Sequence, residues 1–163
     1  MAIDSQIFRS TMGHFPTGVS VVTTSHPTVG DFGITISSLT SLSLNPPLVL
    51  FCLGTNGHSI SVFREVSHFA FNILSQDQGA FSDQFAKRTS VDWECIESSV
   101  DEVSGCRLFS GALAHVVCEK FETFPGGDHE IIIGRVIDMQ VNRQAQPLVR
   151  YTGKYCPLLT TVI

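Results

Sequence analysis

A hydroxyl-rich stretch over residues 33–53 is the first place where this chain could do chemistry. Its hydroxyl side chains alternate imperfectly with apolar ones and no residue is charged, so one side can join a core while the other offers hydroxyls. The hydroxyl residues are Thr35, Ser37, Ser38, Thr40, Ser41 and Ser43. Hydroxyls and free backbone N–H groups bind phosphate through directed hydrogen bonds. Serine and threonine also occur on the solvent face of ordinary strands, and the pattern alone favours that simpler interpretation.

His129 is the second candidate, because it directly follows the tight-turn signal Gly126-Gly127-Asp128. An imidazole there can exchange a proton or orient a substrate near neutral pH. The alternative, a hairpin histidine exposed to water, is favoured by the local pattern alone. The histidines lack the close i, i+4 spacing of a zinc-binding helix, so no metal site is predicted. The Gly-x-Gly-x-x-Gly fingerprint is absent, so a nicotinamide cofactor would be held in another way.

The composition is that of one small folded domain. With 163 residues, we expect a single domain over residues 1–163. Hydrophobic residues make up 43% of the chain and charged residues only 15%, which indicates apolar surface covered by a second copy, as in a homo-oligomer. The net charge is -5 and no run of lysine or arginine occurs, so neither nucleic acid nor an anionic membrane is expected as a partner.

The cysteines and the first residues indicate the compartment. The chain has five cysteines, an odd number without any C-x-x-C pair, which argues against a zinc ribbon or a disulfide framework. We interpret them as reduced, mostly buried thiols. The chain begins without a basic segment followed by an apolar run, and no stretch reaches transmembrane length. A cytoplasmic protein is therefore expected.

Hydrophobic periodicity and turn residues predict the elements of the first half. A helix capped by Asp4 or Ser5 is expected to run until Pro16 and Gly18 end it. Strand 18–24 and the start of the hydroxyl-rich stretch should form an antiparallel pair. Residues 48–53 form a continuous apolar run, which predicts a strand buried on both faces deep in the sheet. Asn56 is expected to cap the next, short helix.

The second half is expected to hold a further strand, a helix and a long hairpin. Residues 68–74 alternate as a strand does, and 77–87 read as a helix ending in a basic pair. An irregular excursion over 89–105 surrounds Trp93, which we interpret as a packing anchor. Two β-branched runs, 111–124 and 129–142, flank a turn signal. The order of elements predicts a mainly β fold with a few helices, in which an antiparallel sheet closes into a barrel.

Several short motifs occur in an order that matches one family. They are Phe15-Pro16-Thr17-Gly18-Val19, the stretch Gly33-Ile34-Thr35-Ile36-Ser37-Ser38, Pro46-Pro47-Leu48, Phe85-Ala86-Lys87-Arg88, and Gly127-Asp128-His129 leading to Gly134-Arg135-Val136. In this order the chain resembles the short-chain flavin reductases, the small component of two-component flavin-dependent monooxygenases. The resemblance implies an antiparallel split β-barrel (the FMN-binding split barrel) that forms a homodimer, binds FMN or FAD and oxidises NADH or NADPH. Reduced flavin would then pass to a separate monooxygenase.

The resemblance also implies which residues touch the nucleotides. Residues of the hydroxyl-rich stretch and the strand after it would face the flavin ring and ribityl chain: Thr35, Ile36, Ser37, Ser38, Ser43, Phe51, Cys52 and Leu53. Two helix ends would hold phosphate or line the site: His58 and Ser59 at one, and Phe85, Ala86, Lys87 and Arg88 at the other. Each end also suits a plain solvated helix terminus, and the sequence does not separate Lys87 from Arg88.

The nicotinamide side of the reaction is assigned by the same resemblance. His129 would reach over the flavin to the nicotinamide, while Tyr151 would stack on the dinucleotide and Lys154 would contribute charge. Hydride transfer requires the two rings to lie about 3 to 3.5 Å apart, so positioning is most of the catalysis. The favoured function is an NAD(P)H:flavin oxidoreductase. A flavin-binding barrel without NAD(P)H turnover, used for electron transfer or storage, is the alternative, and a barrel without flavin is a third.

Overall fold

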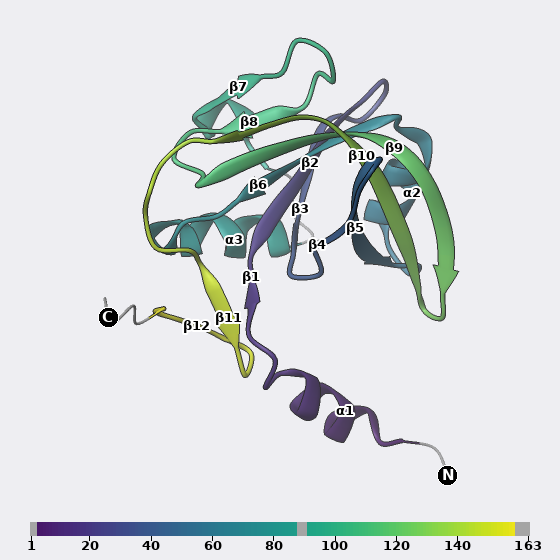
Figure 1. The fold of residues 1–163 in the computed structure, drawn as a ribbon, viewed down its shortest axis with the longest axis vertical. Coiled ribbons are helices and arrows are strands. Elements are labelled where there is room, and N and C mark those ends of the chain that lie inside the picture. Colours follow the sequence, from purple (N-terminus) through teal and green to yellow (C-terminus); the bar gives the residue numbers. More distant parts are fainter. Residues whose placement is uncertain (1–2, 88–90, 159–163) are drawn as a thin grey trace.

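The computed structural model describes residues 3–87 and 91–158, which form a mainly β fold with short helices (Figure 1). The helices are α1 Ser5–Met12, α2 His58–Glu65 and α3 Gly79–Ala86, with 3-10 turns η1 Gln76–Gln78 and η2 Trp93–Cys95. The strands are β1 Thr17–Gly18, β2 Ser20–His26, β3 Gly30–Ile36, β4 Thr40–Leu44, β5 Pro47–Gly54, β6 His68–Ile73, β7 Ser98–Val100, β8 Arg107–Phe109, β9 Ala114–Gly126, β10 His129–Val141, β11 Val149–Tyr151 and β12 Lys154–Cys156.

The main sheet is antiparallel, with strand order β3-β2-β6-β9-β10-β5-β4. This confirms the predicted fold class, the β2–β3 pair and the long β9–β10 hairpin. Strands β3 and β4 follow one another in the chain yet lie at opposite edges of the sheet, so no strand ladder closes the barrel between them. Ser38, in the link between these edge strands, bonds the backbone of Cys52 in β5 instead. No helix in the described residues is long and apolar enough to cross a membrane.

The barrel core is a cluster of phenylalanines. Phe51 in β5, Phe63 in α2, and Phe69 and Phe71 in β6 are at most 1% exposed, and their ring centroids lie 5.2 to 6.3 Å apart in edge-to-face contacts. Such aromatic pairs add packing energy to the burial of large apolar surfaces. Gly134 in β10 lies against this core, since a Cβ there would come within 2.6 Å of Phe69 Cζ. The core therefore fixes β5, β6, β10 and α2 relative to one another.

The prediction that residues 48–53 lie deep in the sheet is wrong. Their strand, β5, lies next to the edge strand β4, and only Phe51 and Leu53 among these residues are buried. Strands β2 and β6 are the buried ones, because β8 covers them: Thr23 and Asn72 both bond the Arg107 carbonyl. A continuous apolar run shows that both faces of a strand are apolar, but it does not show which neighbouring element covers each face.

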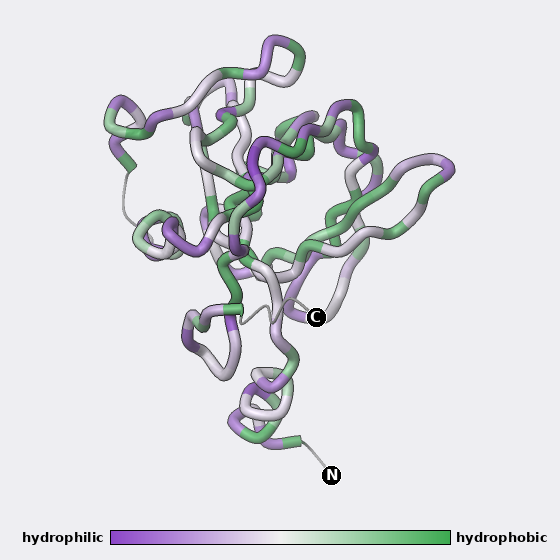
Figure 2. Tube along the Cα trace, turned by 60° about the vertical axis from the view of Figure 1, so that its left-hand side comes forward, coloured by the Kyte–Doolittle hydropathy of each residue, from purple (hydrophilic) through white to green (hydrophobic). Residues whose placement is uncertain are grey.

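Helix ends follow local hydrogen bonding. Asp4 caps α1 as predicted, its carboxylate accepting from the backbone N–H groups of Gln6 and Ile7. The helix ends at Met12, before the predicted stop. Asn56 does not cap α2, whose N-cap is Gly57 with no side-chain hydrogen bond. No residue of α1 is buried, and the helix stands clear of the barrel (Figure 1). Apolar residues recur along this helix (Figure 2).

The five cysteines are free, but only Cys106 and Cys118 are buried, so the prediction of mostly buried thiols is wrong in extent. Burial raises the pKa of the Cys106 thiol to about 11 and that of Cys118 to about 12. A thiol with such a pKa is protonated and unreactive at pH 8. Cys95 is exposed, which leaves it open to reagents.

Thiol labelling of the folded protein at pH 8 is therefore expected to modify Cys95 first and to leave Cys106 and Cys118 unmodified until denaturant is added. Mass spectrometry of peptides after timed alkylation measures the order. Early modification of Cys118 would contradict its burial between β6 and β10.

Candidate functional site

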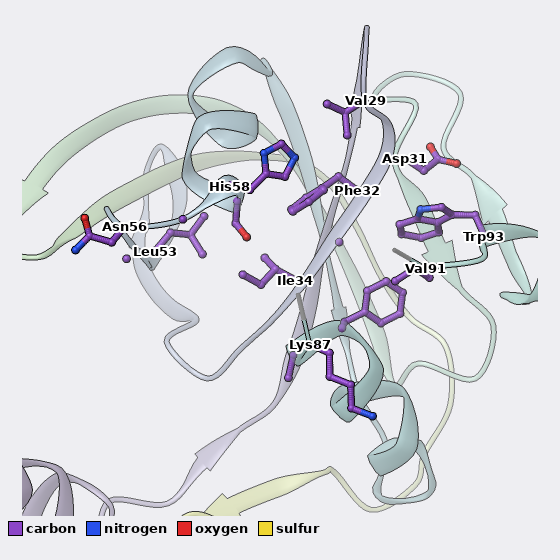
Figure 3. Close-up of a pocket in the computed structure, with 16 residues that line it drawn as sticks. Val29, Asp31, Phe32, Ile34, Leu53, Asn56, His58, Lys87, Val91 and Trp93 are labelled. Carbon is purple, nitrogen blue, oxygen red and sulfur yellow. The ribbon is translucent and has the colours of Figure 1, made fainter. Parts of the chain in front are cut away.

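A cavity of about 640 Å³ opens where β3 and β5 meet the start of α2, the end of α3 and the segment around Trp93 (Figure 3). Its apolar wall consists of Phe32, Ile34, Leu53, Phe85 and Trp93. In Figure 3 the Phe32 side chain lies between His58 on one side and Trp93 on the other. Concave sites lined by apolar and aromatic side chains with a few polar groups are typical of small-molecule sites. The shape and lining suit a flat ring system.

The N-terminus of α2 supplies an anion-binding end to the cavity. Gly57, His58 and Ser59 line the cavity there, and no side chain caps the helix. In the described part of the chain the Ser59 hydroxyl has no hydrogen-bond partner. Uncapped N–H groups and the helix dipole favour negative charge at this position. This end of the cavity can therefore hold a phosphate.

Gly33 permits the close approach of β3 to the aromatic wall. A Cβ at Gly33 would lie 2.9 Å from the Phe85 ring and 3.2 Å from the Trp93 indole. Carbon atoms cannot approach that closely without displacing one of the rings. The glycine in this motif is therefore needed for packing at the cavity wall.

Six of the residues predicted from the resemblance meet at this cavity. They are Leu53, His58, Ser59, Phe85, Ala86 and Lys87. Arg88 lies outside the described residues. The Lys87 amine points away from His58 in Figure 3. The start of α2 and the end of α3 are 28 residues apart in the sequence, and both line the same cavity.

The hydroxyl-rich stretch is arranged differently from the expectation. Thr35 donates from Oγ1 to the Ser82 carbonyl at 2.7 Å, which ties β3 to α3. Ser38 Oγ accepts from Cys52 N at 3.0 Å and donates to Cys52 O at 3.3 Å. None of the remaining predicted residues lines the cavity: Ile36 and Phe51 are buried in the core, Ser37 is exposed, and Ser43 and Cys52 are half-buried. In the single chain, the Thr35 and Ser38 hydroxyls bond backbone groups of neighbouring elements and so stabilise the barrel.

His129 borders the rim of the cavity. It pairs with Gly54, which lines the cavity, and a Cβ at Gly54 would lie 3.9 Å from His129 Nε2. His129 Nδ1 lies 2.7 Å from Asp128 Oδ1, and this hydrogen bond lowers the pKa of the Asp128 carboxyl. A carboxylate acceptor fixes the ring and leaves Nε2 for another partner. The turn thus aims an imidazole along the cavity edge.

Tyr151 and Lys154 do not reach the cavity of their own chain. They belong to the small sheet β1-β11-β12, below the barrel in Figure 1. The Tyr151 ring packs edge-on against His14, with centroids 6.0 Å apart.

Asp31, Phe32 and Val91 line the cavity although the sequence does not predict them as site residues, and Trp93 is predicted as a packing anchor alone. Trp93 does pack on Phe85, at 5.4 Å between centroids, but it also forms the cavity wall. Phe32 carried a usable signal, since it directly precedes the Gly33 motif. No local pattern distinguishes an aromatic residue at a cavity wall from one in the core.

Fold and site together define a small antiparallel barrel with an aromatic, anion-accepting pocket at its open edge. The model of the flavin reductase like domain matches residues 12–159. The reductase subunit HsaB of a flavin-dependent monooxygenase from Rhodococcus jostii is 33% identical, over 94% of this chain and 78% of its own. The FMN reductase (NADH) SmoA of Agrobacterium fabrum is 36% identical, over 93% of this chain and 85% of its own.

Solved structures agree with this result. The NADH:FAD oxidoreductase SgcE6 of Streptomyces globisporus, in complex with NAD and FAD fragments, superposes with a TM-score of 0.92 at 30% identity and covers 100% of this chain and 99% of its own. The flavin reductase component BorF of a bacterial two-component tryptophan halogenase superposes with a TM-score of 0.90 at 29% identity, over 97% of this chain and 100% of its own. The chain belongs to the flavin reductase-like domain family, whose split-barrel fold it shares.

Proposed function

We propose that this protein is an NADH- or NADPH-dependent flavin reductase that reduces FMN or FAD and supplies the reduced flavin to a separate monooxygenase. The observation that carries the proposal is that one cavity joins an aromatic wall to the uncapped start of α2. The relatives named as reductase components support the same role. We further propose that residues 1–163 act as one domain, in the reducing cytoplasm that five free cysteines suit.

The lining residues fit a flavin. Ile34 and Leu53 offer an apolar face to the ring system, and Gly33 keeps the neighbouring strand free of a side chain that would displace the wall. His58 and Ser59 at the start of α2 would hold the phosphate. A bound flavin supplies the hydride acceptor, N5 of its ring. His129, anchored by Asp128, would orient the nicotinamide at the rim.

Rapid mixing of the flavin-loaded protein with NADH tests the proposal. Loss of the flavin absorbance band is expected, because the cavity wall and His129 together allow the two rings to approach. Flavin binding without loss of the band would contradict the proposal and favour a flavin-binding barrel without NAD(P)H turnover. A colourless protein that does not quench the fluorescence of added flavin would favour a structural barrel that binds no flavin.

Ser59→Ala is expected to weaken FMN binding by about tenfold or more, since hydrogen bonds to charged groups are worth about 1.5–3 kcal/mol. Riboflavin has no phosphate, so its affinity should change little. Fluorescence titration with the two flavins measures the difference. Ser61→Ala is the matched control, because its hydroxyl lies in the same helix and bonds the His58 carbonyl outside the cavity. An equal loss for both flavins would place Ser59 away from the phosphate.

We propose in addition that the protein forms a homodimer through its uncovered apolar side chains. Residues Ile7, Phe8 and Met12 of α1 are 54 to 65% exposed, and no residue of the helix is buried. Leu44 at the end of β4 is 96% exposed. Large apolar side chains that are exposed in groups, as on α1, usually mark an interface. The half-buried outer face of β5, next to β4, supports the same arrangement.

Leu44→Asp is therefore expected to shift the protein from dimer to monomer without unfolding it, because the carboxylate would be desolvated in the interface but hydrated in the monomer. Sedimentation velocity measures the mass, and circular dichroism verifies the fold. Val103→Asp, at a loop position that is 77% exposed, is the control and should not change the mass. A wild-type protein that sediments as a monomer would contradict the proposal.

A further inference from the structure

One buried histidine, which does not itself line the cavity, holds the turn between β2 and β3. His26, the last residue of β2, is 6% exposed. Its Nδ1 lies 3.2 Å from the backbone nitrogens of Thr28 and Val29 and 3.2 Å from Thr28 Oγ1. Its Nε2 lies 3.1 Å from Oε2 of Glu65, the last residue of α2. The side chain therefore joins the turn over 27–29 to the end of α2.

These contacts determine where the imidazole carries its proton. A backbone N–H can only donate, so Nδ1 of His26 accepts from Thr28 and Val29 and carries no hydrogen. The proton of the neutral ring is then on Nε2, which donates to the Glu65 carboxylate. A second proton, added at Nδ1, would face two N–H donors, and both of these hydrogen bonds would be lost.

Glu65 does not compensate for this loss. Its carboxylate attracts an imidazolium, but its side chain is 67% exposed, so water screens the attraction. The attraction also acts at Nε2 and restores no partner for Nδ1. In the part of the chain that the structure describes, the other charged or titratable side chains of the elements around His26 are directed elsewhere. Asp31, paired with Arg107, and His68 lie on the opposite face of the sheet, Arg64 pairs with Glu130, Lys120 donates to carbonyls of α2, and His58 is at the far end of that helix.

The turn that His26 holds borders the cavity. Val29 lines the cavity, and so does Phe32, which follows in β3 (Figure 3). The Phe32 ring packs edge-on against His58 at 5.8 Å and Phe63 at 6.2 Å between ring centroids, and both of these residues belong to α2. The position of the turn relative to α2 therefore sets the spacing between this wall and the start of α2.

We propose that His26 is a positioning residue: the neutral imidazole holds the turn over 27–29 against α2, and the imidazolium releases it. An imidazole gains its second proton between about pH 8 and about pH 5. The cavity thus has its binding geometry at the upper end of this range, and its affinity for flavin falls towards the lower end. The inference rests on the proposed function for the identity of the ligand, whereas the turn and its histidine can be followed without any ligand.

Riboflavin titrations at about pH 8 and about pH 5.5 test the effect on affinity, because riboflavin has no phosphate that would itself take up a proton in this range. For the wild-type protein the Kd is expected to rise about three- to tenfold at the lower pH, which corresponds to about one lost hydrogen bond. His26→Asn keeps an acceptor for the N–H two residues on but cannot titrate. It should bind as the wild type does at the higher pH and lose this part of the rise. His26→Ala lacks the acceptor and should bind more weakly at both pH values.

The comparison isolates His26, because His58 and His129 are present in all of these variants and contribute equally to their pH dependence. His68→Asn is the matched control, since this histidine lies on the opposite face of the sheet and bonds Ser67 instead of the turn. It should behave as the wild type does at both pH values. An equal rise in Kd for the wild type and for His26→Asn would overturn the proposal.

NMR of the ligand-free protein tests the positioning of the turn separately. Imidazole nitrogen shifts should show a proton on Nε2 of His26 at about pH 8, and the backbone amide signals of Thr28 and Val29 should move together with the ring signals as the pH falls. A proton on Nδ1 at about pH 8, or amide signals that stay fixed while the ring titrates, would overturn the proposal. Amide signals that move in a protein without affinity for flavin would support the positioning of the turn by His26 and contradict the proposed function.

Discussion

The Phe51→Ala variant is expected to lose about 3–5 kcal/mol of its free energy of unfolding. Phe51 is fully buried and contacts Phe63, Phe69 and Phe71 at 5.2 to 5.6 Å between ring centroids. Truncation removes the transfer free energy of the ring and leaves a cavity that the strands around it cannot close. Such a loss is a large part of the stability of a domain of this size.

Urea denaturation followed by tryptophan fluorescence measures the change, since Trp93 is the single tryptophan. Phe124→Ala is the matched control: this side chain is 45% exposed on β9, and its truncation should cost much less. A loss below about 1 kcal/mol for Phe51→Ala would mean that the barrel core collapses around the gap.

Much of the fold is predictable from periodicity and turn chemistry. The β9–β10 hairpin follows from two β-branched runs around Gly127, which takes the positive φ of +75° that a tight turn requires. Burial of β5 is not predictable, because an apolar run is the same whether a strand or a second copy of the chain covers it. Similarly, the cap of α2 depends on where the chain turns after β5, which Asn56 does not decide.

The candidate site is predictable only in part. The order of motifs brings His58, Ser59 and Phe85 to one cavity, although each motif alone is an ordinary helix end. The hydroxyls of Thr35 and Ser38 are accounted for by carbonyl and amide partners that lie 47 and 14 residues away. A sequence pattern shows that a hydroxyl is present but not whether a distant backbone group already binds it. For this reason the sequence favours the hydroxyl-rich stretch over Trp93 as a candidate for the site.

His129→Ala is expected to raise the KM for the nicotinamide nucleotide by about 10- to 100-fold while the flavin Kd changes little, since removing one partner of a desolvated hydrogen bond costs about 1–3 kcal/mol. His129 Nε2 is near Gly54 at the cavity rim, whereas Ile34 and His58 lie inside. Steady-state assays and flavin titrations give the two quantities separately. An equal rise in the KM for the nicotinamide nucleotide and in the flavin Kd would contradict a role of His129 that is specific to the nicotinamide.

Asp128→Asn separates the imidazole itself from its anchor. The hydrogen bond from His129 lowers the pKa of the Asp128 carboxyl, so the carboxylate is ionised at neutral pH and is protonated only as the pH falls through that lowered value. An asparagine keeps an acceptor for Nδ1 without the charge, so we expect a smaller rise in KM than for His129→Ala. Because both groups are partly or fully exposed, the variant should not alter stability measurably. If Asp128→Asn raises KM as much as His129→Ala does, the ring acts only in the orientation that the carboxylate imposes.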